Sequence, residues 1–234
     1  MACILILYDN RTEHSDLMPG WGFSALIERG GQKILFDAGA DKLVLEHNAD
    51  VLGVDLESTD FLVLSHEHCD HIGAITSALH KNLEVFYPAS FSVLFRGEVS
   101  GEKGWRSHPV SQPGEIVSGV QTTGELGGRI KEQGLIFEGE QGSVLVTGCA
   151  HPGIVEMVRV ATELLDRPLR LVLGGLHLLG KKKQDVRAIA AELKKMGVKR
   201  IAPCHCTGKK AMAVLEAAFA SSYVGVTVGS QIRV

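Results

Sequence analysis

The segment His66–His71, with the sequence HEHCDH, carries the strongest chemical signal in the chain and directly follows a short apolar run. Residues two apart in an extended chain point to the same side, so His66 and His68 can present two imidazoles to one cation. Asp70 and His71 come where the chain turns into an expected helix, and they can face a second cation nearby. These donors suit Zn²⁺, with Mn²⁺ and Fe²⁺ as alternatives. The competing interpretation is a polar turn with three surface histidines.

Three more histidines, and one aspartate, follow other apolar runs: His151, His177, His205 and Asp37. Ligands of α/β proteins gather beyond the ends of strands, so we expect these motifs to converge on one site. Each histidine can also be an ordinary loop or capping residue. Asp37 either caps the segment that starts at Ala40 or orients a ligand histidine through its carboxylate.

The motif His-x-His-x-Asp-His after a buried strand resembles the metallo-β-lactamase superfamily, and the other motifs follow in the same order from Leu5 to about Gly208. Asp37 matches the strand-end aspartate that supports the metal loop of the family. His151 matches the third histidine and His205 the last. Four segments further resemble the dihydropterin–ribofuranosylaminobenzene phosphate synthase-like subgroup, namely residues 8–10, 147–151, 174–178 and 205–208.

The resemblance implies a centre with one or two zinc ions. It assigns His66, His68 and His151 to the first ion, and Asp70, His71 and His205 to the second. His177 stands where the superfamily usually has an aspartate that bridges both ions. A neutral imidazole offers one lone pair and cannot bridge in this way. His177 therefore either binds one metal or hydrogen-bonds a bound anion.

The five cysteines are an odd number in a chain that is not small, which argues against a disulfide scaffold. Cys69 and Cys149 lie close enough in sequence to the histidines to approach a metal, although a small buried residue is the ordinary role of a cysteine. Cys204 and Cys206 flank His205. On an extended chain they would point away from it.

The apolar patterns predict an α/β (α+β) protein, and with the resemblance they predict a four-layer αββα sandwich in a single domain, residues 1–234. Strands are expected over 3–7, 23–28, 33–36, 61–64, 143–146, 169–173, 198–202 and 224–228. Helices are expected over 72–79, 153–165, 184–196 and 209–220. The Gly-Gly pair at residues 30–31 predicts a hairpin, and Gly197 a helix end.

Substrate-binding features are fewer. Thr207, Gly208 and Lys209 open the last expected helix, whose first N–H groups favour a phosphate or carboxylate. The alternative is an ordinary helix cap at Thr207 with solvated lysines. Trp105 and Arg106 lie in the Gly-rich segment 97–114, which we expect to be a functional loop or lid that can cover a planar, pterin-like ring.

The composition is that of a globular protein: 234 residues, 45% hydrophobic, 22% charged and a formal net charge of −3. The net charge provides no global basic field for nucleic acid. The first apolar run is too short for a bilayer span and has no basic residue before it, so we expect no membrane segment and a cytoplasmic protein. The expected partner is a small-molecule substrate.

These features predict a metal-dependent hydrolase that acts on a small phosphorylated or ester-type substrate. Asp70 is the expected catalytic residue, because it can bind metal and also orient the nucleophile or take its proton. Three alternatives remain open: a transferase that forms a pterin conjugate, an iron-dependent oxidoreductase, and a non-enzymatic metal-binding protein.

Overall fold

The structure is a computed structural model that describes residues 2–100 and 104–234. The chain divides into two compact units. The first comprises the residues up to Ser111 together with Thr227–Val234, and the second comprises Gln112–Val226. The single domain expected from the sequence stays a prediction.

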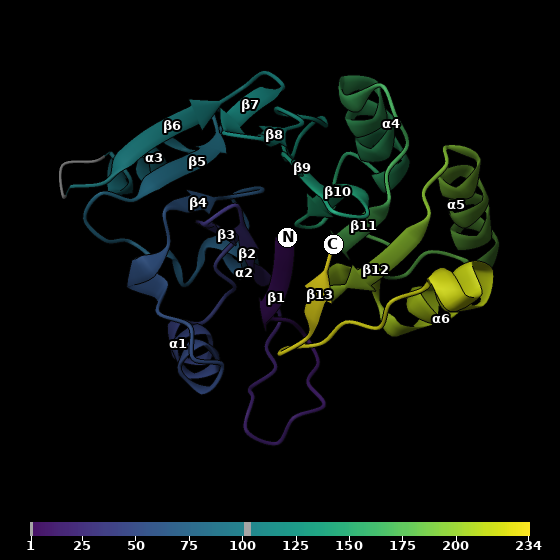
Figure 1. The fold of residues 1–234 in the computed structure, drawn as a ribbon, viewed down its shortest axis with the longest axis horizontal. Helices are drawn as coiled ribbons and strands as arrows, with labels where there is room; N and C mark the ends of the chain where they lie inside the picture. Colours follow the sequence, from purple (N-terminus) through teal and green to yellow (C-terminus); the bar gives the residue numbers. More distant parts are fainter. Residues whose placement is uncertain (1, 101–103) are drawn as a thin grey trace. The chain divides into compact units, whose positions relative to one another are not determined.

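The first unit is built on a seven-stranded mixed sheet in the order β13-β1-β2-β3-β4-β5-β6 (Figure 1). The strands are β1 (Ala2–Tyr8), β2 (Ser24–Arg29), β3 (Gln32–Phe36), β4 (Phe61–Val63), β5 (Glu84–Pro88), β6 (Arg106–Val110) and β13 (Gln231–Arg233). The predicted hairpin joins β2 to β3, and its two glycines have φ angles of 58° and 84°. Two positive φ angles define the tight turn that suits the twist of paired strands.

Strands β3 and β4 run parallel, with Phe36 opposite Val63. Their carboxyl ends therefore lie at the same edge of the sheet, which brings Asp37 and the segment 65–71 together. The core of this unit forms where α1 (Lys42–Val51) and α3 (Val93–Glu98) cover the sheet, through residues such as Leu45 and Phe95. Burial of these apolar side chains is the main stabilising contribution to the unit.

The second unit contains a six-stranded sheet in the order β12-β11-β10-β9-β8-β7. The strands are β7 (Gly114–Val117), β8 (Val120–Thr122), β9 (Leu135–Gly139), β10 (Gly142–Thr147), β11 (Leu171–Gly175) and β12 (Arg200–Cys204). Strands β10, β11 and β12 are parallel to one another. The segments that follow them, which carry His151, His177 and His205, therefore leave the sheet at one edge.

Helices α4 (Ile154–Leu165), α5 (Lys183–Lys195) and α6 (Lys209–Phe219) lie on one side of this sheet (Figure 1). Their apolar faces share one core with the strands, represented by Met157, Leu193 and Leu215. Helix α5 ends as predicted at Gly197, whose φ is 87°. The Val198 N–H then donates to the Leu193 carbonyl at 3.1 Å, which closes a Schellman motif.

Two predicted elements are wrong. The helix expected over 72–79 is a short α2 (Cys69–Ile72) followed by a 3₁₀ turn at Ile75–Ser77. It breaks because the Asp70 carbonyl accepts from the Phe23 N–H and the Ala74 N–H donates to the Gly39 carbonyl, so tertiary bonds replace helical ones. The strand expected over 224–228 makes only isolated bridges, and the final strand is β13.

The segment 97–114 is not a continuous loop. Strand β6 occupies Arg106–Val110 and β7 begins at Gly114, while residues 101–103 lie outside the described part of the chain. None of the helices in the described ranges combines the length and the apolar character needed to cross a bilayer.

Candidate metal centre

The first cluster of candidate ligands lies at the carboxyl ends of β3 and β4, within the first unit. Its centre is the fully buried carboxylate of Asp37, which adopts a φ of 57°. Asp37 Oδ1 accepts from the Ser65 N–H at 2.7 Å, and Oδ2 accepts from the Ser65 hydroxyl at 2.7 Å. Oδ2 also lies 2.7 Å from Nδ1 of His71. One aspartate thus anchors both ends of the histidine motif.

These bonds assign the protons on two imidazole rings. A carboxylate only accepts, so Nδ1 of His71 carries a proton and Nε2 presents a lone pair. The Ser65 hydroxyl gives its one proton to Asp37, so it accepts from Nδ1 of His66 at 2.9 Å. The Nε2 atom of His66 then also presents a lone pair. This is the arrangement in which hydrogen-bonded histidines bind metals.

The His66 and His68 rings fit a shared cation. Nε2 of His66 lies 3.1 Å from Nδ1 of His68. Two imidazoles on one tetrahedral zinc place their nitrogens about 3.3 Å apart, given a Zn–N distance of 2.0–2.1 Å. Nε2 of His71 lies 3.8 Å from Oδ2 of Asp70, whose side chain is 14% exposed. These two atoms thus lie close enough to bind one cation, and the assignment of Asp70 and His71 to one ion stays a prediction.

The second cluster lies in the second unit, in the segments that follow β10, β11 and β12. The ligand atoms of Cys149, His151 and His177 lie within 4.8 Å of one another, and so do those of Cys149, His205 and Cys206. The ring centres of His151 and His177 are 4.4 Å apart. Three strand ends thus bring imidazole and thiol groups together, as expected for a site at the edge of a parallel sheet.

A buried carboxylate that the sequence analysis missed holds the first of these segments. Oε1 of Glu132 accepts from the N–H groups of Cys149 (2.9 Å) and Ala150 (2.8 Å), and Oε2 accepts from that of His151 (2.8 Å). Glu132 is fully buried. Nothing local in the sequence marks it, because its partners lie 17–19 residues further along the chain.

The other two segments are joined to each other. The Leu176 N–H donates to the Thr207 hydroxyl at 3.1 Å, and the Leu179 N–H donates to the Cys206 carbonyl at 3.2 Å. His177 and His205 both adopt left-handed backbone conformations, with φ angles of 50° and 47°. Such conformations cost of order 1–3 kcal/mol and persist only where surrounding bonds enforce them.

Comparison with known proteins identifies the fold family. The model of the metallo-beta-lactamase superfamily matches residues 19–205. The chain belongs to this superfamily. It is 29% identical over 262 residues to the 7,8-dihydropterin-6-methyl-4-(beta-D-ribofuranosyl)-aminobenzene-5'-phosphate synthase of Methanocaldococcus jannaschii, covering 92% of this chain and 89% of the relative.

An uncharacterized protein of the same organism is 28% identical, with 97% of this chain and 99% of the relative covered. A crystal structure described as a metal-dependent hydrolase of the beta-lactamase superfamily superposes with a TM-score of 0.81 at 24% identity, covering 100% of this chain and 99% of the other. The α/β metallo-β-lactamase fold predicted from the sequence is thereby confirmed.

A divalent metal is implied by the metallo-β-lactamase fold, and the donors present fit one. His66 and His71 present Nε2 lone pairs whose orientation is fixed by hydrogen bonds to Nδ1. Imidazole and carboxylate donors suit zinc, manganese or iron. The individual ligand assignments stay predictions.

The Cys206 thiol lies close to the side chain of His205, contrary to the expectation from the sequence. His205–Thr207 forms a 3₁₀ turn and not an extended chain, so the expectation that Cys206 points away from His205 is wrong. Hydrogen bonds with Cys149 and then His177, together with the charge of His205, lower the pKa of Cys206 to about 4 against the effect of burial. The bond with Cys206 in turn raises the pKa of His177.

Several expected substrate residues take structural roles. Trp105 is part of the core of the first unit and donates from Nε1 to the Val99 carbonyl. Arg106 lies on the surface in an ion pair with Glu84. The cap of α6 is Gly208 and not Thr207, whose hydroxyl is occupied by Leu176.

Proposed function

We propose that the protein is a metal-dependent hydrolase that acts on a small phosphorylated or ester-type substrate. The observation that carries this proposal is the bonding of Asp37, which turns the Nε2 atoms of His66 and His71 into metal-binding donors. A buried carboxylate carries the cost of desolvating its charge, so its bonds to two histidines favour a functional role over a purely stabilising one. Membership of the metallo-β-lactamase superfamily also supports a metal-dependent hydrolase.

The proposed ligand sets are those that the family resemblance implies, with zinc as the preferred metal. They are His66, His68 and His151 for one ion, and Asp70, His71 and His205 for a second. When bound, such a cation supplies Lewis-acid chemistry and lowers the pKa of the water it holds to about 7. Asp70 would orient the attacking water and accept its proton, and His177 would bind one ion or hydrogen-bond an anionic group.

The proposed substrate class rests on a cavity of about 510 Å³ at the start of α6. It is lined by residues 178–181 and 207–211, including Lys181, Lys209 and Lys210. The first N–H groups of a helix and three ammonium groups favour a phosphate or carboxylate. Gly208 has a φ of 78° here, and a side chain at this position would collide with Leu179. We therefore propose that Gly208 and Lys209 contact an anionic group of the substrate.

A second candidate function is a synthase that forms a pterin conjugate. The observation that favours it is the 29% identity, over most of both chains, to the phosphate synthase of M. jannaschii. The same metal ligands would serve either reaction, and the same anion-binding cavity would hold the phosphate group wherever the substrate is phosphorylated.

The experiment that tests the proposal combines metal analysis with a panel of phosphodiester, lactone and thioester substrates. The compared proteins are the wild type, His66→Ala, and the control variant His14→Ala, which removes an exposed histidine outside every motif. We expect wild type and His14→Ala to hydrolyse at least one class and to contain zinc. His66→Ala should lose at least a hundredfold in rate and most of its zinc.

Equal rates for wild type and His66→Ala would refute a metal-dependent hydrolase. Zinc-containing wild-type protein that leaves the whole panel intact, but condenses a dihydropterin with a ribofuranosylaminobenzene phosphate, would favour the synthase instead.

A further inference from the structure

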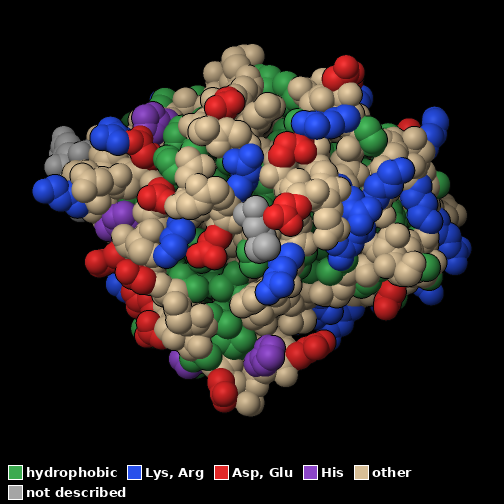
Figure 2. Space-filling model, viewed as in Figure 1, with side chains coloured by type: hydrophobic (Ala, Val, Ile, Leu, Met, Phe, Trp, Pro, Cys, Tyr) green, Lys and Arg blue, Asp and Glu red, His purple; other side chains and the backbone are tan. Residues whose placement is uncertain are grey.

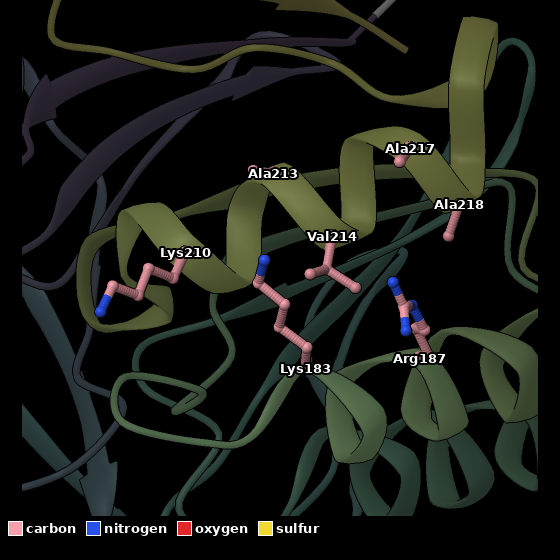
Figure 3. A pocket seen from close by; sticks show the side chains of 7 residues that line it. All are labelled: Lys183, Arg187, Lys210, Ala213, Val214, Ala217 and Ala218. Atoms are coloured by element: carbon pink, nitrogen blue, oxygen red, sulfur yellow. The ribbon is translucent and has the colours of Figure 1, made fainter.

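A second cavity in the second unit lies between α5 and α6, on their exposed sides (Figure 3). Its volume is about 580 Å³, within the range of about 300–1,000 Å³ typical of small-molecule sites. One set of lining residues comes from α6 and is apolar: Ala213, Val214, Ala217 and Ala218. The other set is cationic and comes from both helices: Lys183, Arg187 and Lys210. We call this cavity the α5–α6 groove.

The cations of the α5–α6 groove are not neutralised by the protein. In Figure 3 the side chains of Lys183 and Arg187 extend from α5 toward α6. Across residues 2–100 and 104–234, neither these two nor Lys210 has a carboxylate within 4.0 Å. On α4, by contrast, Arg159 forms ion pairs with both Glu156 and Glu163. The groove therefore has an uncompensated positive charge.

The groove also lies in the most basic part of the chain. Ten of the 24 lysines and arginines fall within residues 181–210, which contain only two acidic residues, although the whole chain has a net charge of −3. In Figure 2, Lys and Arg side chains gather over the part of the molecule where Figure 1 places the helices α5 and α6. Like charges that are held close together repel, so this clustering has an electrostatic cost that a bound anion would relieve.

Helix stability does not explain the cations. Lys183 is the first residue of α5, and Lys210 is the second residue of α6. Cations near a helix N-terminus oppose the helix dipole, at a cost of about 0.3–1 kcal/mol each. These residues are therefore placed against the preference of the helices that carry them.

The apolar floor indicates what kind of anion the groove accepts. Ala213 and Ala217 are exposed, and their methyl groups leave the space between the helices open. A purely polar anion such as inorganic phosphate would leave this apolar surface in water, whereas an apolar body would cover it. Among the described residues of the second unit, the only large apolar side chain that is strongly exposed is Leu179. The surroundings of the groove thus lack the contiguous exposed apolar patch that marks many protein-binding surfaces, which favours a small ligand.

We propose that the α5–α6 groove binds an anionic amphiphile, a small molecule with an apolar chain or ring and a phosphate or carboxylate head. The apolar body lies on Ala213, Val214 and Ala217. The head group pairs with Lys183 and Arg187. This site is separate from the proposed metal ligands, since none of its lining residues belongs to them.

The test is calorimetric titration of the full-length protein with dodecyl phosphate below its micelle concentration. Three comparison ligands separate the contributions: inorganic phosphate carries the head alone, dodecyltrimethylammonium carries the same chain with the opposite charge, and vesicles of anionic lipid present the head group at a membrane. We expect saturable binding of dodecyl phosphate, at least tenfold tighter than that of either soluble comparison ligand.

Three variants locate the site. Arg187→Ala removes a head-group contact, and Ala217→Leu fills the floor with a residue that helices tolerate well. Each should weaken binding of dodecyl phosphate at least fivefold. Lys195→Ala removes a charge from the same helix outside the groove and should leave binding unchanged. Lys210 is left intact because it also lines the cavity at the start of α6, where the substrate is proposed to bind. The three variants should therefore keep the hydrolase activity, which serves as an independent control.

Absence of saturable binding would overturn the proposal, as would equal binding by wild type and Arg187→Ala. Equal affinity for dodecyltrimethylammonium would contradict the role of the cations and show that the groove binds any apolar chain. Binding to anionic vesicles alone would contradict a soluble ligand and show that the groove contacts a membrane. If Ala217→Leu fails to fold, as judged by circular dichroism, Arg187→Ala decides the question.

Discussion

The buried carboxylate of the first unit, Asp37, holds two candidate ligands through their rings, whereas the buried carboxylate of the second unit, Glu132, holds the backbone of the segment that carries His151. In the first unit, Asp37 bonds Nδ1 of His71 directly and reaches Nδ1 of His66 through the Ser65 hydroxyl. In the second unit, Glu132 bonds three successive backbone N–H groups, which end at that of His151.

The bonds of Asp37 and those of Glu132 fix different features of the candidate ligands. A bond to Nδ1 fixes the tautomer and rotation of an imidazole, and therefore which nitrogen can bind a metal. A bond to the backbone fixes where the Cα atom lies but leaves the side chain to rotate. Loss of Asp37 should thus disturb the chemistry of the ligands, and loss of Glu132 their position. Substitutions at the two carboxylates can separate these effects.

Asp37→Ala should have the largest effect. It leaves the Ser65 N–H, the Ser65 hydroxyl and the His71 ring without their buried acceptor, which should lower the free energy of unfolding by about 4 kcal/mol. The affinity of the proposed metal centre for zinc should fall about a hundredfold, the upper range for partners of metal ligands. Urea denaturation and competition with a chelator measure the two quantities.

Asp37→Asn is the variant that sharpens the comparison. Asparagine tolerates the φ of 57° and can still accept from the Ser65 N–H. Its NH₂ group, however, faces the Ser65 hydroxyl and Nδ1 of His71, so His71 must change its tautomer. We expect about half the stability loss of Asp37→Ala with the same loss of zinc affinity. An Asp37→Asn protein that binds zinc like the wild type would show that ring orientation is not the role of Asp37.

Glu132→Gln should have the next largest effect on zinc affinity. Its amide oxygen can keep the bonds from Cys149 and Ala150, but its NH₂ group then faces the N–H of His151. We expect the free energy of unfolding to fall by about 3 kcal/mol, since bonds to a buried charged group are involved. Zinc affinity should fall about tenfold, less than for Asp37→Asn. The same two measurements apply.

The matched control for Glu132→Gln is Glu216→Gln, which makes the same chemical change at an exposed position of α6. It should leave both stability and zinc affinity within error of the wild type. If Glu132→Gln loses more zinc affinity than Asp37→Asn, the distinction between holding a ring and holding a backbone segment is wrong.

The same contrast explains what could be predicted from the sequence. The histidine motif of the first unit is contiguous, and its strand is a buried apolar run, so both were recognised from local pattern. Hairpin β2–β3 and helices α4, α5 and α6 were likewise predicted, because turn glycines and apolar spacing determine them locally. Glu132 could not be found, since its three partners are brought to it only by the fold.

Predictions also failed where tertiary bonds replaced local ones. The helix over 72–79 looked regular in sequence, yet the Asp70 carbonyl accepts from Phe23 and ends it. Trp105 looked like a loop residue that could cover a substrate because glycines surround it, but it is buried in the core. Cys206 was expected to point away from His205 on an extended chain, and the 3₁₀ turn there reverses this.

Ser65→Ala tests whether the chain of bonds from Asp37 to His66 matters by itself. It removes the hydroxyl that donates to Asp37 and accepts from His66, while the Ser65 N–H bond to Asp37 is kept. The free energy of unfolding should fall by about 2 kcal/mol. Zinc affinity should fall about tenfold, because the His66 ring loses its fixed tautomer. Ser15→Ala, at an exposed serine, is the control. If Ser65→Ala binds zinc as tightly as the wild type, the Ser65 hydroxyl does not orient the His66 ring for metal binding.

Thr207→Val should have the smallest effect, because it breaks one bond within the second unit. The valine side chain matches threonine in shape but leaves the buried Leu176 N–H without its acceptor, at a cost of about 1 kcal/mol in unfolding free energy. Thr207→Ser keeps the hydroxyl and should retain most of that stability. Because this bond holds the backbone next to His177 and touches no ring, zinc affinity should change less than threefold in Thr207→Val. A larger loss of zinc, restored in Thr207→Ser, would mean that a single backbone bond in the second unit controls its ligands as tightly as Ser65 controls those of the first.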